Sequence, residues 1–340
     1  MKRTLKKTSL QTLFGLLLVF VIHFFYQSTS IHLPDSNGNV SLYSTHAQDD
    51  LRRTFIAAIE SAKQSILLEI YTLTDANIIQ ALKSRAEQGI TVEVLVDSKA
   101  SPQAKKQLGP LVKTTRRTPQ GLMHLKILVI DDSQVWISSA NMTYDSMLTH
   151  GNIVAAMDNP ALATTIRQRV AETPSSGPAP QTPVIAFSQN GQNGELWFLP
   201  NPGQGLNRLI DAIKQAKEQV RIAMFTWTHP LITQAVIDAH KRGVDVEVVI
   251  DSYQGKGAGA QVVQKLQKAN VKTSLSQGKG LLHYKILIVD HHTLVCGSAN
   301  WTRSAFKQND DCMFFLFPLT ESQNRFLDQM WAKIIRETKK

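Results

Sequence analysis

The sequence is poor in cysteine: Cys296 and Cys312 are the only two in 340 residues. So few cysteines exclude a scaffold held together by a framework of disulfides. The two residues flank one copy of a repeated motif, and in an exported protein on neighbouring strands they would be able to form a single bridge. Two buried thiols are the commoner outcome for such a pair.

Long hydrophobic runs are also scarce, since Leu13–Phe25 is the only one and a single polar residue interrupts it. A spanning helix needs roughly 20 apolar residues, whereas the hydrophobic part of a signal peptide needs about 7–15. A basic stretch precedes the run, and Ser28 and Ser30 follow at spacings suited to cleavage. We therefore expect residues 1–30 to be a signal peptide or a retained anchor, and the protein to be exported across a membrane or anchored in it.

Charged residues are few, at 19%, and hydrophobic residues make up 43%, which is typical of a folded protein. The formal net charge is +10, and four of these positive charges lie at the extreme N-terminus. The remaining excess of about +6 favours an anionic partner such as phospholipid or nucleic acid, although a role in solubility alone is equally compatible with it. Composition does not choose between the two partners.

One short pattern occurs twice in the chain: His-x-Lys, four residues, Asp, six residues, and then a small residue followed by Ser-x-Asn. Every internal spacing is kept in both copies, which chance does not readily produce. The pattern indicates one active site built from two equivalent halves. The first copy comprises His124, Lys126, Asp131, Ser139 and Asn141, and the second comprises His283, Lys285, Asp290, Ser298 and Asn300.

The repeat extends well beyond this motif, because Gln64–Thr74 matches Glu218–Thr228 and Gly89–Asp97 matches Gly243–Asp251. Five extra residues fall in the second half near Gly255–Gly259, where we expect a flexible surface insertion. A run rich in proline and serine separates the halves and is typical of an extended linker. We predict domains at 45–172 and 184–340, a linker at 173–183, and motif regions at about 118–145 and 277–304.

Each half alternates amphipathic helices with apolar strands and contains a hairpin at the motif, which predicts an α/β sandwich with a mixed sheet covered by helices. The fold class expected is thus two tandem, pseudo-symmetric α/β sandwich domains. The predicted helices are Leu51–Ala62, Ala76–Gln88, Ala161–Ala171, Leu206–Ala216, Pro230–Arg242 and Glu321–Arg336, and the predicted hairpins are Leu125–Ile130 with Val135–Ser138 and Tyr284–Val289 with Leu294–Gly297.

The residue types of the motif suit a tetrahedral anion. Residues two apart on a strand project from the same face, so the imidazole and the ammonium group converge. Two halves facing each other would enclose two histidines, two lysines and two asparagines, which neutralise and hydrogen-bond a phosphate. The two histidines can then divide the roles of nucleophile and general acid. Asp131 and Asp290 lie at the ends of their strands, an odd number of residues after the lysines, and therefore project from the other face. We expect them to support the fold.

Carboxylates are not clustered on the His-Lys face, and two lysines there would repel a divalent cation. We therefore expect neither a metal nor another cofactor. Because the pocket is internal to one chain, no protein partner is expected to be obligatory.

At these residues the sequence resembles the phospholipase D superfamily, whose signature is a doubled HxK(x)4D(x)6GSxN motif. The resemblance implies a two-step displacement at a phosphodiester through a covalent phosphohistidine, without a metal. It implies His124 as nucleophile and His283 as general acid and base. It also implies that the phosphate is held by Lys126, Lys285, Asn141 and Asn300, with Ser139 and Ser298 contributing to phosphate binding and positioning.

Two positions depart from the signature of this superfamily. Ser138 replaces the first glycine of the first motif. Members often carry an acidic residue about ten positions after the motif asparagine, which orients the opposing histidine. The second half offers Asp310 and Asp311 as supporting residues, whereas the first half has Gly151 and Asn152. We therefore expect an asymmetric site in which one histidine lacks a carboxylate partner.

The preferred function is a phosphodiesterase of phospholipase D type that hydrolyses or transfers the head group of a phospholipid at a membrane surface. Trp227, Trp301 and Phe306 are expected to be exposed near the mouth, where they would engage acyl chains. An exported, metal-independent endonuclease with nucleic acid as substrate is the first alternative. A phosphatidyltransferase of cardiolipin synthase type and a binding protein without catalytic activity are the others.

Overall fold

The computed structural model describes residues 31–36, 38–201 and 203–339. The expected signal or anchor segment, residues 1–30, lies outside the described residues. Within the described part, no helix combines the length and the apolar character that crossing a membrane requires.

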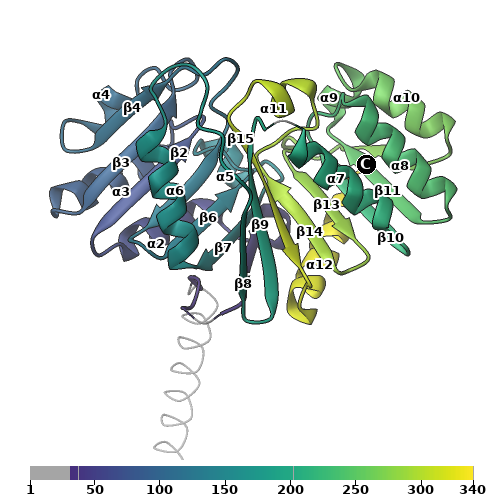
Figure 1. Cartoon of the computed structure of the whole chain (residues 1–340), viewed down its shortest axis with the longest axis horizontal. Helices are drawn as coiled ribbons and strands as arrows, with labels where there is room; N and C mark the ends of the chain where they lie inside the picture. Colours follow the sequence, from purple (N-terminus) through teal and green to yellow (C-terminus); the bar gives the residue numbers. More distant parts are fainter. Residues whose placement is uncertain (1–30, 37, 202, 340) are drawn as a thin grey trace, which may run out of the picture. The chain divides into compact units, whose positions relative to one another are not determined.

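The first half of the described chain is built on a mixed sheet of seven strands in the order β1-β7-β6-β5-β2-β3-β4 (Figure 1). Strands β2, β3 and β4 run parallel to one another, whereas β5, β6, β7 and β1 continue the sheet by antiparallel pairing. The strands are β1 (Ser41–Ser44), β2 (Ser65–Ile70), β3 (Thr91–Asp97), β4 (Lys113–Arg117), β5 (Lys126–Ile130), β6 (Gln134–Ser138) and β7 (Ile153–Asp158). The helices are η1 (Thr45–Ala47), α2 (Leu51–Ser61), α3 (Ala76–Glu87), α4 (Ala104–Leu108), α5 (Tyr144–Leu148) and α6 (Pro160–Glu172).

The second half repeats this plan in a sheet of eight described strands, in the order β12-β11-β10-β13-β14-β15-β9-β8. Parallel pairing again joins the first strands, and antiparallel pairing the others. The strands are β8 (Ile185–Gln189), β9 (Gln192–Leu199), β10 (Gln219–Met224), β11 (Asp245–Ile250), β12 (Lys272–Leu275), β13 (Lys285–Val289), β14 (Thr293–Gly297) and β15 (Asp311–Phe317). The helices are α7 (Gln204–Gln215), α8 (Pro230–Lys241), α9 (Ser252–Lys256), α10 (Ala260–Lys268), α11 (Arg303–Lys307) and α12 (Glu321–Arg336).

Local sequence explains where these helices begin. Asp50, Asp75 and Asn159 accept hydrogen bonds from backbone N–H groups in the first turns of α2, α3 and α6. Thr320 and Gln323 form a reciprocal capping box at the start of α12. Such caps satisfy donors that a helix N-terminus otherwise leaves unpaired.

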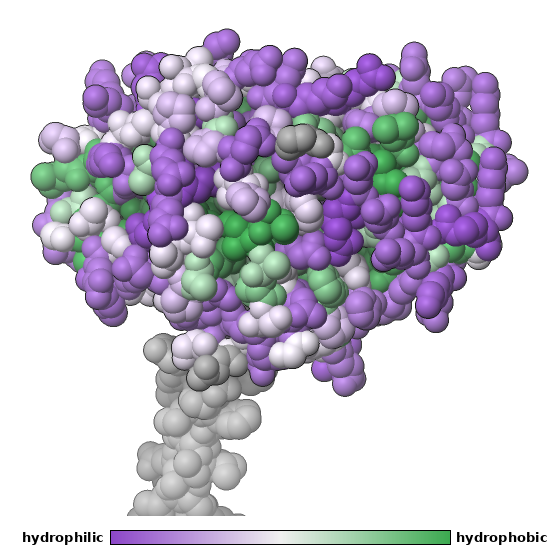
Figure 2. Space-filling view, in the orientation of Figure 1, coloured by the Kyte–Doolittle hydropathy of each residue, from purple (hydrophilic) through white to green (hydrophobic). Residues whose placement is uncertain are grey.

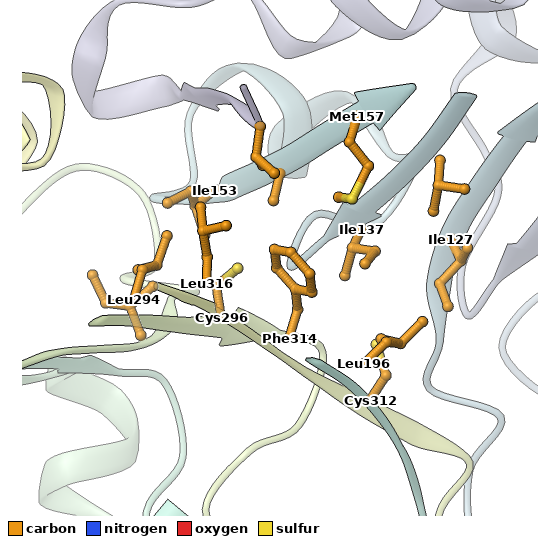
Figure 3. Close-up of a cluster of buried hydrophobic side chains, with 14 of the residues drawn as sticks. Ile127, Ile137, Ile153, Met157, Leu196, Leu294, Cys296, Cys312, Phe314 and Leu316 are labelled. Carbon is orange, nitrogen blue, oxygen red and sulfur yellow. The ribbon is translucent and has the colours of Figure 1, made fainter. Parts of the chain in front are cut away.

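The two halves share a hydrophobic core between their sheets. Side chains of the first sheet and of the second point toward one another in Figure 3, with Ile137 and Met157 on one side and Phe314 and Leu316 on the other. Cys296 and Cys312 are buried in this core as free thiols, so the disulfide left open by the sequence is absent. Burial of apolar surface from both halves fixes the motifs opposite each other.

A second core lies on the other face of the second sheet, where α7, α8 and α10 cover it. On the molecular face shown in Figure 2, hydrophilic residues predominate and apolar residues form small separate groups. The described chain therefore buries its apolar residues mainly between the sheets and under the helices.

The predicted fold class is confirmed, since both sheets are mixed and α/β. The first sheet begins at Ser41, before the predicted start at residue 45. Gly255–Gly259 is part of an ordered helix and turn, with Gly255 buried, where we expected a flexible insertion. The hairpin of β8 and β9 was not predicted.

Candidate active site

Both motifs lie at equivalent places in the two sheets. Strands β5 and β13 begin at Lys126 and Lys285, so each motif histidine lies two residues before a central strand. The backbone N–H groups of Met123 and Leu282, one residue before each histidine, donate to the carboxylates of Asp97 and Asp251 at 2.9 and 3.0 Å. These two buried aspartates hold the strand entries in place.

Each histidine is oriented by the opposite half of the chain. His124 Nδ1 lies 2.8 Å from Oδ1 of Asp311, on β15. His283 Nδ1 lies 3.0 Å from Oδ1 of Asn152, just before β7. The Asn152 amide N–H donates to the backbone carbonyl oxygen of Ser146 at 2.7 Å. Because a carbonyl oxygen can only accept, this contact fixes the orientation of the Asn152 amide, and its Oδ1 atom faces His283 as an acceptor.

These partners fix the tautomers of both rings. A carboxylate and an amide oxygen can only accept hydrogen bonds, so Nδ1 carries the proton in His124 and in His283. The Nε2 atom of each ring therefore remains for the substrate. The expected asymmetry is present: Asp311 gives His124 a carboxylate partner, whereas His283 has the neutral amide of Asn152.

The motif serines do not lie where ligands of a phosphate would be expected. Both side chains are fully buried. Ser298 Oγ donates to Asp311 Oδ1 at 2.7 Å, and Ser139 Oγ donates to Asn152 Oδ1 at 2.8 Å. Each hydroxyl thus holds the residue that orients the histidine of the other half, and its hydrogen is not directed at a phosphate.

The two lysines are buried beside their histidines. Lys126 Nζ donates to the carbonyl oxygen of His124 at 2.6 Å, and Lys285 Nζ donates to that of His283 at 2.7 Å. Burial lowers the pKa of Lys126 to about 7, and burial and the neighbouring Lys126 hold the pKa of Lys285 well below its usual value. An anion bound here would restore the charge on both lysines.

Sequence reasoning missed an aromatic residue in each half, Tyr71 and Phe225, which occupy matching positions of the repeat. Their ring centroids lie 5.1 Å from the His124 ring and 4.8 Å from the His283 ring. Lys126 and Lys285 stand over the same two rings at 5.1 and 5.0 Å. The retained aromatic character in both copies was the signal that would have identified them.

The electrostatics of the histidines follow from their burial among cations. Burial and Lys126 lower the pKa of His124, while Asp311 opposes this change. Burial, Lys285 and Lys126 lower the pKa of His283 further below its usual value. Although burial opposes it, His124 holds the pKa of Asp311 below its usual value, so that carboxylate is ionised. The histidines and lysines therefore carry less positive charge in the empty site than when an anion is bound, because an anion favours their protonated forms.

The motif asparagines are half-buried at the same edge of the two sheets. The Asn141 Oδ1 atom is buried without a hydrogen-bond partner among the described residues. Asn300 Oδ1 accepts from the Thr226 backbone N–H at 3.3 Å. Because phosphate oxygens accept hydrogen bonds, the contact expected for Asn141 would use its amide N–H group and not this oxygen.

The remaining motif aspartates support the fold, as the sequence indicated. Asp131 accepts backbone N–H groups from Lys63, Gln64 and Ser65, and Asp290 accepts three equivalent groups at the start of β10. Asp310 forms a buried ion pair with Arg117 of the first half, so it differs from its neighbour Asp311 and does not orient a histidine.

The aromatic residues expected at the mouth are not exposed. Trp227, Trp301 and Phe306 are 0%, 3% and 5% exposed and belong to the second core. Trp227 and Trp301 pack edge to face with their centroids 4.7 Å apart. They stabilise the loops that follow β10 and the motif, so the hypothesis that they engage acyl chains was wrong.

Among the described residues, no three or more His, Cys, Asp or Glu side chains form a group that could hold a metal ion. The site that the structure assembles contains two lysines, two amides and two histidines whose Nε2 atoms have no hydrogen-bond partner in the described part of the chain. This set can bind a phosphate and supply a nucleophile and a proton donor.

The chain matches a family described as "Cardiolipin synthase, PLD-like domain" over residues 55–173 and again over 209–331. It is 32% identical over 139 residues to a mitochondrial cardiolipin hydrolase of Mus musculus, covering 41% of this chain and 62% of that protein. It is also 32% identical over 109 residues to a phospholipase D of Rickettsia bellii, covering 32% of this chain and 54% of that protein. The chain thus spans between half and two thirds of the length of these relatives.

A solved structure shows the same fold over most of the chain. The phosphatidylserine synthase of Haemophilus influenzae aligns with a TM-score of 0.71 at 14% identity, covering 90% of this chain and 88% of that one. At this identity the likeness concerns the fold alone. Together with the family match to both halves and the doubled motif, it leads to one conclusion: the chain belongs to the phospholipase D superfamily and carries two phospholipase D-like regions.

Proposed function

We propose that the protein is a phosphodiesterase that hydrolyses or transfers the head-group phosphodiester of a phospholipid, without a metal, through a covalent phosphohistidine. The observation that carries the proposal is the crossed pairing of His124 with Asp311 and of His283 with Asn152. This pairing leaves the two Nε2 atoms available to act on one phosphate. Relatives named cardiolipin hydrolase and phospholipase D support a lipid substrate.

Substrate binding begins with charge neutralisation. Lys126 and Lys285 are buried, and each repels the positive charge of the other. A phosphodiester anion between them removes this repulsion and accepts their hydrogen bonds. Asn141 and Asn300 add amide donors to its oxygens. The electrostatic stabilisation increases as charge develops on those oxygens in the transition state.

In the first step, Nε2 of His124 attacks phosphorus and a P–N bond forms. The bond from phosphorus to the oxygen of the leaving alcohol breaks, and protonated His283 transfers its Nε2 proton to that oxygen. The ring of His124 gains positive charge as it is phosphorylated, and the carboxylate of Asp311 at Nδ1 stabilises that charge.

In the second step, neutral His283 takes a proton from water as the water oxygen attacks phosphorus. The P–N bond breaks, so His124 returns to its starting state and His283 is again protonated. An acceptor alcohol in place of water gives transfer of the phosphatidyl group by the same route. The two steps thus use one general acid and base in alternation.

The unequal partners support this division of roles. A carboxylate partner makes His124 the more basic ring and therefore the better nucleophile. A neutral partner leaves protonated His283 the stronger acid, which favours proton transfer to a poor leaving group. Phosphate binding between the lysines supplies the negative charge that keeps His283 protonated before the reaction.

The test is to trap the intermediate. The His283→Ala variant, given a short-chain lipid ester with p-nitrophenol as leaving group, should accumulate a phosphatidyl adduct on His124, because the activated leaving group needs no acid and the base for the second step is missing. Intact mass and peptide mapping locate the adduct. An adduct on His283 in the His124→Ala variant would reverse the roles.

Substrate class is tested on the detergent-solubilised full chain in EDTA. Phosphatidylcholine, cardiolipin and single- and double-stranded DNA are compared in parallel assays. Release of a head group without nuclease activity is the expected result. DNA cleavage without head-group release would favour the endonuclease alternative, and loss of all activity in EDTA that added metal restores would contradict a metal-free mechanism.

A further inference from the structure

A large cleft of ≈ 1110 Å³ lies between residues of the two halves, and Leu281 and His150 are part of its lining. Its first-half wall contains Asp145, Thr149 and His150, and its second-half wall contains residues 251–254, 256–258 and 276–281. The ring of His150 lies 6.4 Å from the ring of His283, centroid to centroid. Leu281, two residues before His283, forms part of the wall. The cleft is therefore lined by neighbours of His283, the proton donor of the proposed reaction, although His283 itself is not part of its wall.

Part of the cleft wall comes from a segment in which the two halves differ. The second half carries the five extra residues, and they follow β11 as α9 and the turn after it (Figure 1). Asp251, at the end of β11, uses its two carboxylate oxygens to hold the backbone of Gln254 in α9 and that of Leu282 beside the motif. This carboxylate ties the inserted segment to the strand entry of His283.

Most groups that line the cleft are polar, and its exposed charged side chains are Lys256, Lys279 and Asp145. Lys256 and Lys279 are exposed and form no salt bridge within the described part of the chain. The buried Asp251 accepts from backbone donors, and both it and the exposed Asp145 oppose the lowering of the His150 pKa by burial. Tyr253, 77% exposed, adds an aromatic rim. Two unpaired ammonium groups in one cleft favour an anionic group of a ligand.

We propose that this cleft binds the leaving alcohol of the substrate and selects phospholipids whose head group carries a second phosphate, with Lys256 and Lys279 as its ligands. The inference rests on the proposed function. Because His283 protonates the leaving oxygen, the head group departs on the side of the molecule where the cleft lies. A glycerol phosphate fits easily in a cleft of this volume. A cationic head group such as choline would meet two lysines and bind less well.

The experiment compares two monomeric substrates, so that the charge of a membrane surface plays no part. Dibutyroyl phosphatidylglycerol releases glycerol, and dibutyroyl phosphatidylglycerophosphate releases glycerol phosphate. We expect the full chain to favour the second substrate in kcat/KM. The Lys256→Gln/Lys279→Gln variant should lower that preference by about tenfold, the value of one charge-assisted contact, and leave kcat/KM on the first substrate within about twofold.

The matched control is Lys105→Gln/Lys106→Gln, which removes two exposed lysines of α4 outside the cleft. It should keep the preference of the full chain. An unchanged preference in the Lys256/Lys279 variant, or equal losses on both substrates, would overturn the proposal while the phosphodiesterase function stands.

Calorimetric measurement of glycerol 3-phosphate binding, with glycerol as reference, tests the anion site separately from the phosphodiesterase function. If neither lipid is cleaved, the phosphodiesterase proposal fails. Weaker binding of glycerol 3-phosphate in the Lys256/Lys279 variant would still support the anion site, and equal binding would overturn it. Cleavage of a dinucleotide in a manner that needs both lysines, without cleavage of either lipid, would assign the cleft to nucleic acid and contradict the lipid proposal.

Discussion

At the scale of single residues, one amide in place of a carboxylate sets the two histidines apart. Asn152 and Asp311 occupy equivalent places, each bonded to a motif serine and to the histidine of the opposite half. The Asn152→Asp variant should give His283 a carboxylate partner and raise its pKa. A group with a raised pKa keeps its proton to higher pH, so the alkaline limb of kcat should move up by about one pH unit.

The pH–rate profile of the variant checks this expectation, and Asn159→Asp is a matched control because Asn159 caps α6 and lies on another element. An alkaline limb that stays in place would show that the proton lost on that limb does not reside on His283.

Conversely, Asp311→Asn should slow formation of the adduct on His124 by roughly a hundredfold, since the charged ring loses its counter-ion. Rapid quench measurements of adduct formation test that rate.

The spacing of the motif predicted which residues form the candidate site. It predicted only some of the roles that these residues have within it. A doubled His-x-Lys identifies four residues without any structure. The sequence did not distinguish Asp310 from Asp311, because the choice depends on which of two adjacent side chains faces His124. The serines could not be assigned either, since a hydroxyl that holds Asp311 has the same sequence signature as one that holds phosphate.

At the scale of elements, the turn after β5 gives a further prediction. Asp131 has a positive φ of 51° and accepts backbone N–H groups from the three residues that lead into β2. The Asp131→Ala variant should lower the free energy of unfolding by about 2 kcal/mol, because three donors lose their acceptor and alanine disfavours this backbone conformation. Urea denaturation measures the change, and the activity of the folded fraction should stay within about twofold.

Asp132→Ala is the control, since its exposed ion pair with Arg167 should contribute little. Although partial burial opposes it, the backbone donors hold the pKa of Asp131 below its usual value. The stabilisation is thus present above the unfolded pKa and disappears as the pH falls through the folded pKa. An equal effect of both substitutions at neutral pH would contradict this role.

The alternation of amphipathic helices with apolar strands predicted the long elements well, and Glu321–Arg336 was predicted with its observed bounds. The structure shows a capping box at the start of this helix. The edge strands β4 and β8 were missed, since they are short and partly polar or exposed. Trp227 and Trp301 were misjudged for another reason. Proximity to the motif in sequence suggested exposure, whereas their loops fold back and pair with each other by a parallel bridge.

At the scale of the whole molecule, the site depends on contacts that cross between the halves. Tyr284, next to His283, donates or accepts at 2.5 Å from Ser44 and 2.9 Å from His46 of the first half. The backbone N–H of His124 donates to the Asp310 carbonyl at 2.7 Å, and the Asp310 N–H donates to the Leu122 carbonyl at 2.8 Å. The contacts that hold the two halves together therefore also position the two histidines.

The buried ion pair of Arg117 and Asp310 tests this connection. Both side chains are at most 2% exposed, and Arg117 also donates to the carbonyl oxygens of Pro174 and Gly177 in the linker. The Arg117→Met variant would leave Asp310 buried and unpaired, so we expect a loss of about 3–5 kcal/mol in the free energy of unfolding. Because Asp310 also holds the backbone at His124, kcat of the folded fraction should fall as well.

Arg116→Met removes the exposed neighbour, whose guanidinium bonds the Ser98 carbonyl, and should cost less than about 1 kcal/mol. The double variant Arg117→Met/Asp310→Leu removes the unpaired charge and should recover much of the stability. If it recovers stability but not kcat, the ion pair acts mainly by setting the backbone of Asp310 against His124. If the single variant is as stable and active as the wild type, the alignment of the histidines does not depend on this contact, and the hydrophobic core between the sheets alone positions the site.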